Sequence, residues 1–192
     1  MKKNNKYDNH LNLKVMKTIK HYLLLGMALL IAGTISAQNF KYIGANNCKT
    51  CHNKPAQGAQ YDKWTEDLHS QALKSLSSEK AIDYAKKNGI VDASKEAACL
   101  KCHSTYDVAP ENLRNGIQAG EGVSCEGCHG AGSSYRSPAI MKNANVAKRQ
   151  GLIEQDEKLC RVCHNSDSPF YKEFDFKTAF EKTAHPDPTR KR

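Results

Sequence analysis

The sequence predicts a small, mainly α-helical protein whose helices are joined by long loops, with little or no β-sheet. Several segments place apolar residues at helical spacing, and no segment shows the alternating pattern of a strand. The 192 residues allow one domain or two small ones, and only 39% of them are hydrophobic. With so few apolar side chains, either another component fills the interior or part of the chain is disordered.

The first 37 residues have the pattern of an export signal. Six lysines precede an apolar run at residues 22–35, which is short for a transmembrane helix, and Ile35-Ser36-Ala37 fits a cleavage site. Met16 is an alternative start, because a complete leader follows it, and an uncleaved membrane anchor is the alternative interpretation. We predict a signal peptide over residues 1–37, cleavage near Ala37, and an exported, periplasmic domain over residues 38–192.

The first expected helix covers residues 58–76 and carries an apolar face with His69 beside it. That face consists of Tyr61, Trp64, Leu68, Ala72, Leu73 and Leu76. A second helix is expected over residues 78–88, with Ser78 as its N-cap and Asn88-Gly89 as its end.

Three later helices are expected, and the first two of them run into cysteine-containing motifs. They cover residues 93–103, 154–164 and 175–185, the last ending before Pro186. Residues 110–132 are glycine-rich and read as a loop, and residues 133–151 are polar with little periodicity.

All eight cysteines lie in four copies of one motif, C-x-x-C-H, which is the attachment motif of c-type haem. The two thiols bond to the porphyrin, and the following histidine is the proximal iron ligand. The cysteine pairs are Cys48 and Cys51, Cys99 and Cys102, Cys125 and Cys128, and Cys160 and Cys163, followed by His52, His103, His129 and His164. Four covalent haems would also supply the apolar bulk that the side chains lack.

Three other interpretations of the cysteines explain less of the pattern. Four disulfides would suit an exported protein, and paired C-x-x-C motifs bind zinc, but neither requires a histidine after each pair. Thioredoxin-like redox pairs need a strand–helix context that the sequence lacks. We therefore predict a tetrahaem c-type cytochrome with a haem-filled core.

The basic net charge of +9 does not indicate nucleic-acid binding. Without residues 1–37, which hold six lysines and one aspartate, 23 basic and 19 acidic residues remain, a net charge of +4. The expected partners are redox proteins, with docking to a membrane-bound quinol-oxidising or respiratory complex as one form of that partnership.

Few residues remain to ligate the distal faces of the irons. Residues 38–192 hold six histidines, and His69 and His185 are the two outside the motifs, so two haems at most can have two histidine ligands from this chain. The alternatives are a half-exposed helical histidine for His69 and a helix C-terminal partner for His185. Met141 is either a packing residue or a thioether ligand. The Gly130-Ala131-Gly132 turn allows the backbone to approach a porphyrin closely.

The sequence resembles the tetrahaem cytochrome c-554 family. The resemblance lies in residues 48–52 and 60–72, in GEGVSCEGCHGAG at residues 120–132, in residues 160–164 and in residues 174–185. It implies a mostly helical fold with haems in close contact, some pairs parallel and others near perpendicular.

The resemblance also implies a ligand set. It places His69 opposite His129 on the third haem, His185 opposite His164 on the fourth, and leaves the His103 haem five-coordinate. The first haem, on His52, takes in the family a histidine from the segment after the third motif. Residues 133–150 hold no histidine here but contain Met141, with Lys142 beside it. We therefore hypothesise that His52 and Met141 ligate the first haem.

Two functions follow from these features. The first is an electron carrier that passes single electrons between redox partners through closely packed haems, with no catalytic residue. The alternative is an enzyme that reduces nitric oxide, nitrite or hydroxylamine at an open iron on His103. A subunit of a larger respiratory complex is a third possibility.

Overall fold

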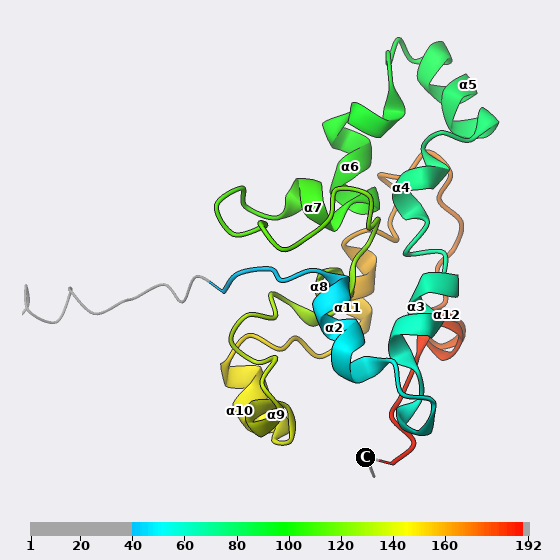
Figure 1. The fold of residues 1–192 in the computed structure, drawn as a ribbon. Coiled ribbons are helices and arrows are strands. Elements are labelled where there is room, and N and C mark those ends of the chain that lie inside the picture. Colours follow the sequence, from blue (N-terminus) through cyan, green and yellow to red (C-terminus); the bar gives the residue numbers. More distant parts are fainter. Residues whose placement is uncertain (1–39, 190–192) are drawn as a thin grey trace, which may run out of the picture. The chain divides into compact units, whose positions relative to one another are not determined.

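The computed structural model describes residues 40–189, which lie in one compact unit, Asn39–Arg192. The predicted leader, with the apolar run at residues 22–35, Met16 and Ala37, falls outside the described residues. The described residues form helices and turns and contain no strand, which confirms the mainly α-helical class (Figure 1). None of the helices among residues 40–189 is long and apolar enough to cross a membrane.

The α-helices are short and are joined by turns and longer loops. In chain order they are α2 (Ala45–His52), α3 (Gln60–Glu66), α4 (Ala72–Ser75), α5 (Glu79–Lys87), α6 (Ala97–His103), α7 (Thr105–Val108), α8 (Cys125–His129), α9 (Pro138–Met141), α10 (Ala144–Arg149), α11 (Glu157–Arg161) and α12 (Phe176–Thr183). Two 3-10 turns are η2 (Pro55–Gln57) and η3 (Ala93–Lys95).

Helix α5 confirms the prediction for residues 78–88. The Ser78 side chain accepts a hydrogen bond from the Ala81 N–H group, and Asn88 is the C-cap. Helix α12 is capped by Asp175 and ends at Thr183, two residues before His185. The helices expected over residues 93–103 and 154–164 exist as the shorter α6 and α11.

The single helix expected over residues 58–76 is wrong, because the chain breaks between α3 and α4. Asp67 has an extended ψ of 150°, and its carboxylate accepts the His69 backbone N–H group at 2.8 Å. A short acidic side chain that bonds the backbone two residues on competes with helical hydrogen bonding. His69 therefore lies in a turn, and Leu68, which was expected on the apolar face, is 86% exposed.

Helices α9 and α10 occupy residues 133–151, where the weak periodicity predicted none. Pro138 stands in the first turn of α9, and the Asn143 side chain caps α10 by accepting the Val146 N–H group. These capping residues mark the helices better than their apolar pattern does.

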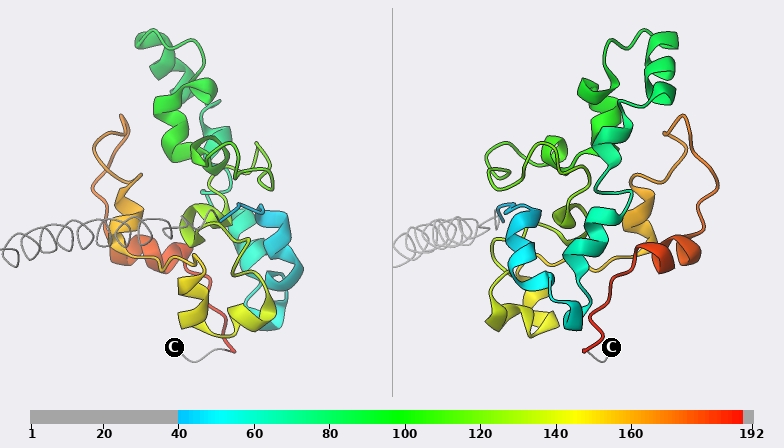
Figure 2. Two further views of the ribbon diagram at one scale, coloured as in Figure 1. Left: turned by 90° about the vertical axis from the view of Figure 1, so that its left-hand side faces the viewer. Right: turned by 45° about the vertical axis from the view of Figure 1, so that its right-hand side comes forward.

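The helices contact one another in local groups (Figures 1 and 2). Helix α4 contacts α6, α5 contacts η3, α2 contacts both α3 and α8, and α9 contacts α10. The buried cluster between α4, α5, η3 and α6 contains Leu76, Ala85 and Ala93. Most buried apolar residues among those described are alanines, so the side chains alone provide a small core.

Candidate haem-binding site

Each C-x-x-C-H motif lies at the C-terminal end of a short helix. Helices α2, α6 and α8 end at the motif histidines His52, His103 and His129. Helix α11 ends at Arg161, and the backbone continues the turn, because the His164 N–H group donates to the Cys160 carbonyl at 2.9 Å. None of the eight cysteines is in a disulfide. Helical turns therefore hold both thiols and the histidine of each motif close together.

The Glu126 carboxylate, inside the third motif, holds the segment that leads into the first motif. It accepts the backbone N–H groups of Ile43 at 2.9 Å and Gly44 at 2.8 Å, and also that of Gly132 at 2.6 Å. The Glu126 side chain is buried, with 2% of its surface exposed. A buried carboxylate needs such donors, and these donors join helix α2 to helix α8.

The thiols of the first and third motifs contact each other. A hydrogen bond between the Cys48 and Cys125 side chains lowers the pKa of Cys48, and the same bond, together with burial, raises the pKa of Cys125. Sequence spacing gives no sign of this pairing, since the two motifs are separated by the second one.

The fourth motif lies between the third and the second. Burial and then the charge of Cys160 raise the pKa of Cys128. Burial and the neighbouring Cys102 thiol raise the pKa of Cys163 to about 12. Lys101 and Asp167 form an ion pair at 3.0 Å beside this second contact. The first and third motifs, and the second and fourth, thus have thiols in contact, and the third and fourth motifs are near enough for their thiol charges to interact.

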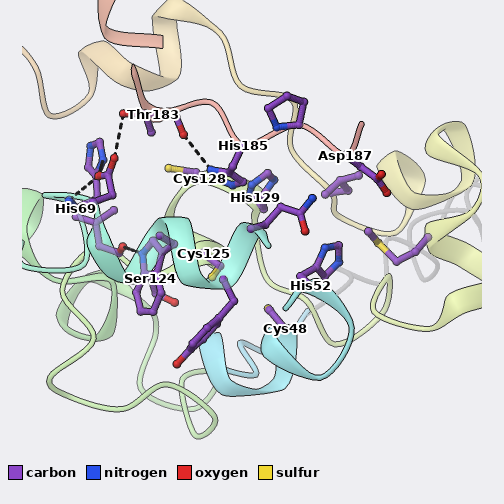
Figure 3. Close-up of a pocket in the computed structure, with 18 of the residues that line it drawn as sticks. Cys48, His52, His69, Ser124, Cys125, Cys128, His129, Thr183, His185 and Asp187 are labelled. Atoms are coloured by element: carbon purple, nitrogen blue, oxygen red, sulfur yellow. Dashed lines mark hydrogen bonds and ion pairs between the residues drawn. The ribbon is translucent and has the colours of Figure 1, made fainter. Parts of the chain in front are cut away.

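A cavity of about 360 Å³ lies beside the first and third motifs (Figure 3). Its wall includes Cys48 and Cys125 together with aromatic side chains such as Trp64 and Tyr135. The candidate ligands His52, His69, His129, His185 and Met141 also line it. The cavity therefore gathers the attachment groups and ligands of more than one predicted haem.

The two histidines outside the motifs each lie opposite a motif histidine. The ring centres of His69 and His164 are 5.9 Å apart, and those of His129 and His185 are 6.1 Å apart. Metal–imidazole bonds are about 2 Å long, so two imidazoles on opposite faces of one metal have ring centres roughly 6 Å apart. Both spacings fit a shared iron.

These neighbours differ from the ligand pairs that the resemblance implied, and which pairs share an iron stays a prediction. The resemblance placed His69 with His129 and His185 with His164, whereas the structure places His69 beside His164 and His185 beside His129. Figure 3 shows His185 next to His129, with His69 on the other side of the view. The break after α3 carries His69 toward the fourth motif, and the chain after α12 brings His185 to the third.

Hydrogen bonds occupy the Nδ1 atom of several candidate histidine ligands. Where Nδ1 donates its proton to a carbonyl, the Nε2 atom is left available to bind a metal. The Nδ1 atom of His185 lies 2.9 Å from the Thr183 carbonyl oxygen, and that of His103 lies 2.7 Å from the Ala72 carbonyl oxygen. The Gln155 amide nitrogen, which can only donate, lies 2.9 Å from Nδ1 of His129, so this contact orients the ring but does not by itself leave Nε2 unprotonated. Such partners set the tautomer and orientation of a metal-ligating histidine.

Burial also favours the neutral imidazoles that metal ligation requires. It lowers the pKa of His129 to about 4, with further contributions from His185 and His52. Burial, followed by the charge of His69, lowers the pKa of His164. The donor set of free thiols, neutral imidazoles and an apolar cavity therefore fits covalently attached haem.

The glycine turn after His129 packs closely against neighbouring protein. Gly130 has a φ of +76°, and a Cβ atom there would meet the carbonyl oxygen of Gly151. At Gly132 a Cβ atom would meet the Ile43 side chain. The close approach that the structure shows at these glycines is to neighbouring protein, and a close approach to porphyrin stays a prediction.

Sequence reasoning missed several residues that shape the site. Asp67, Glu126, Gln155 and Thr183 all position candidate ligands or motifs through hydrogen bonds. Only Asp67 had a readable signal, an acidic residue two positions before a candidate ligand. Glu126 and Gln155 act across long sequence separations, and Thr183, two residues before His185, holds it through a backbone carbonyl, which residue type does not signal.

Comparisons with known proteins agree with these features. The family model described as cytochrome c554 and c-prime matches residues 47–130, which contain the first three motifs. The cytochrome c-554 of Nitrosomonas europaea is 27% identical over 157 residues, covering 70% of this chain and 62% of that protein. This chain thus spans less than two thirds of the length of the relative. No solved structure gives a significant match.

Proposed function

Taking this chain as a protein of the cytochrome c-554 family, which the family model and the relative both support, we propose that it is an exported tetrahaem electron carrier. In this proposal it exchanges single electrons with redox partner proteins in the periplasm. A membrane-bound quinol-oxidising or respiratory complex is the form of partner that suits an exported carrier.

The observation that carries this function is the connected order of the four motifs. Cys48 contacts Cys125, Cys128 neighbours Cys160, and Cys163 contacts Cys102. Four haems attached at these thiols would form one continuous series, since neighbouring attachment points lie side by side. A carrier needs this continuity, whereas an enzyme needs only one reactive site.

The haems, when bound, supply the one-electron chemistry. The chain supplies attachment through eight thiols and axial ligation by histidine. His129 and His185 are proposed to hold the third haem, and His164 and His69 the fourth, on the ring spacings above. His52 and Met141, which line one cavity, are proposed for the first.

The count of attached haems gives the direct test. We expect the mass of the purified exported protein to equal that of residues 38–192 plus four haems. A Cys99→Ala, Cys102→Ala double variant is the matched control and should carry three. A wild-type protein with fewer than four haems, or one that retains residues 1–37, would contradict the corresponding part of the proposal.

A reductase remains the second candidate because of the ligand count. His69 and His185, the two histidines of residues 38–192 outside the motifs, lie next to His164 and His129, which leaves neither for His103. An iron with an open face there could bind nitric oxide, nitrite or hydroxylamine. Stopped-flow reoxidation of the reduced protein by these compounds, with turnover, would favour the enzyme, and fast electron exchange without turnover would favour the carrier.

A further inference from the structure

Asp67 occupies a special position among the residues around the candidate ligands. Its Oδ1 atom lies 2.7 Å from Nδ1 of His69 and accepts the His69 backbone N–H group at 2.8 Å. One carboxylate oxygen thus holds both the ring and the main chain of the ligand. From the other side, the Val123 N–H group donates to the His69 carbonyl at 2.9 Å, so the whole residue is fixed.

The second oxygen of Asp67 contacts Thr183, which in turn holds His185. The Thr183 hydroxyl donates to Oδ2 at 3.4 Å, and the Thr183 carbonyl accepts from Nδ1 of His185 at 2.9 Å. Asp67 also lines the cavity shared by these ligands. It therefore connects both histidines that lie outside the motifs.

The chemistry of this contact differs from that at the other histidines. His185 and His103 donate their Nδ1 protons to neutral backbone carbonyls, whereas His69 donates to a carboxylate. A carboxylate acceptor gives the imidazole more negative character and makes its other nitrogen a stronger donor to a metal. Stronger donation favours ferric over ferrous iron and lowers the reduction potential.

We propose that Asp67 is a positioning residue that lowers the reduction potential of the haem attached at Cys160 and Cys163, acting through its hydrogen bond to His69. The inference rests on the proposed haem attachment and on the ring pairing of His69 with His164. Of His69, His103, His129 and His185, whose Nδ1 atoms have hydrogen-bond partners, His69 alone bonds a carboxylate. The haem on the fourth motif is thereby expected to have a lower reduction potential than it would have with a neutral partner on its histidine ligand.

The test is an Asp67→Asn substitution in the full-length holoprotein. Asparagine keeps an oxygen that can accept the His69 backbone N–H group, but its side chain is neutral. We expect the variant to retain four haems, and we expect one of its four reduction potentials to shift upward. An EPR-monitored redox titration follows each low-spin signal separately and identifies the haem that shifts.

Two further variants make the result specific. Glu66→Gln removes the same charge one residue away, from an exposed side chain at the end of α3, and should produce a smaller shift. Asp67→Glu keeps the charge and should restore part of the wild-type potential. If Asp67→Asn fails to incorporate haem, the Asp67→Glu variant still tests the proposal. It shows whether the reduction potential of the fourth-motif haem changes when the carboxylate is moved by one methylene group.

Two outcomes overturn the inference while the proposed function stands. One is a haem-replete Asp67→Asn protein whose four potentials match the wild type. The other is an upward shift no larger than that of Glu66→Gln, which would assign the effect to charge at a distance. A wild-type protein that lacks covalent haem would contradict the proposed function itself, so the two failures are distinguishable.

Discussion

At the scale of single residues, Glu126 is a buried acid that joins two haem-attachment motifs. Burial raises its pKa above the ordinary value of 4.5, and the N–H groups of Gly132, Ile43 and Gly44 oppose this without cancelling it. A raised pKa in the folded state means that ionisation favours unfolding. The stability linked to this group is therefore fully present below pH 4.5 and is lost as the pH rises through the folded pKa.

We expect Glu126→Gln to remove this pH dependence and to lower the free energy of unfolding by about 1–3 kcal/mol, because the amide group presents donors to backbone N–H groups. Denaturant unfolding of the holoprotein at pH values on both sides of 4.5 measures both effects. Glu111→Gln, an exposed carboxyl in a loop, is the control. An unchanged pH profile in Glu126→Gln would contradict the assignment.

The separation of two residues along the chain decides whether the sequence could predict their role in the site. The motif cysteines and histidines are readable because their chemistry depends on local spacing. The partners of His69 and His185 are not, because each pairing joins residues far apart in the chain. The resemblance to known proteins supplied ligand candidates, but the structure places each of them beside a different motif histidine from the one implied.

At the scale of elements, capping side chains decide where helices begin and end. Ser78 and Asn143 start α5 and α10, and Asp67 ends the first expected helix early. Capping residues predicted α5 and an amphipathic pattern predicted α12. Apolar periodicity wrongly joined α3 to α4, because an amphipathic pattern continues across a break that one side chain causes. Where a haem is expected to supply apolar contacts, periodicity is a weaker guide to the helices.

Helix α9 presents Met141 at its end, on the cavity that also contains His52. A thioether ligand raises the potential of a haem relative to a second histidine. We expect Met141→Ala to lower the potential of the His52 haem and to abolish its thioether–iron absorption band. Redox titration with optical detection measures both.

Lys142→Ala is the matched control for this element, since Lys142 is the neighbouring alternative ligand. The control should leave both the band and the potential unchanged. Loss of the signal in Lys142→Ala, or a Met141→Ala protein that behaves as the wild type, would reject thioether ligation by this helix.

At the scale of the whole molecule, the number of ligands is smaller than the number of predicted iron faces. Four irons have eight axial positions, and residues 38–192 contain six histidines and one methionine. His69 and His185 lie next to His164 and His129, and Met141 shares a cavity with His52. No histidine or methionine of residues 38–192 is left for the axial position opposite His103.

We therefore expect the EPR spectrum of the fully oxidised holoprotein to show one high-spin haem and three low-spin haems. Addition of a small ligand such as nitric oxide should remove the high-spin signal without affecting the three others. Met141→Ala serves as an internal comparison, because it should open a second iron and double the high-spin signal. Four low-spin signals in the wild type would mean that another group ligates the His103 haem, and the reductase alternative would then lose its site.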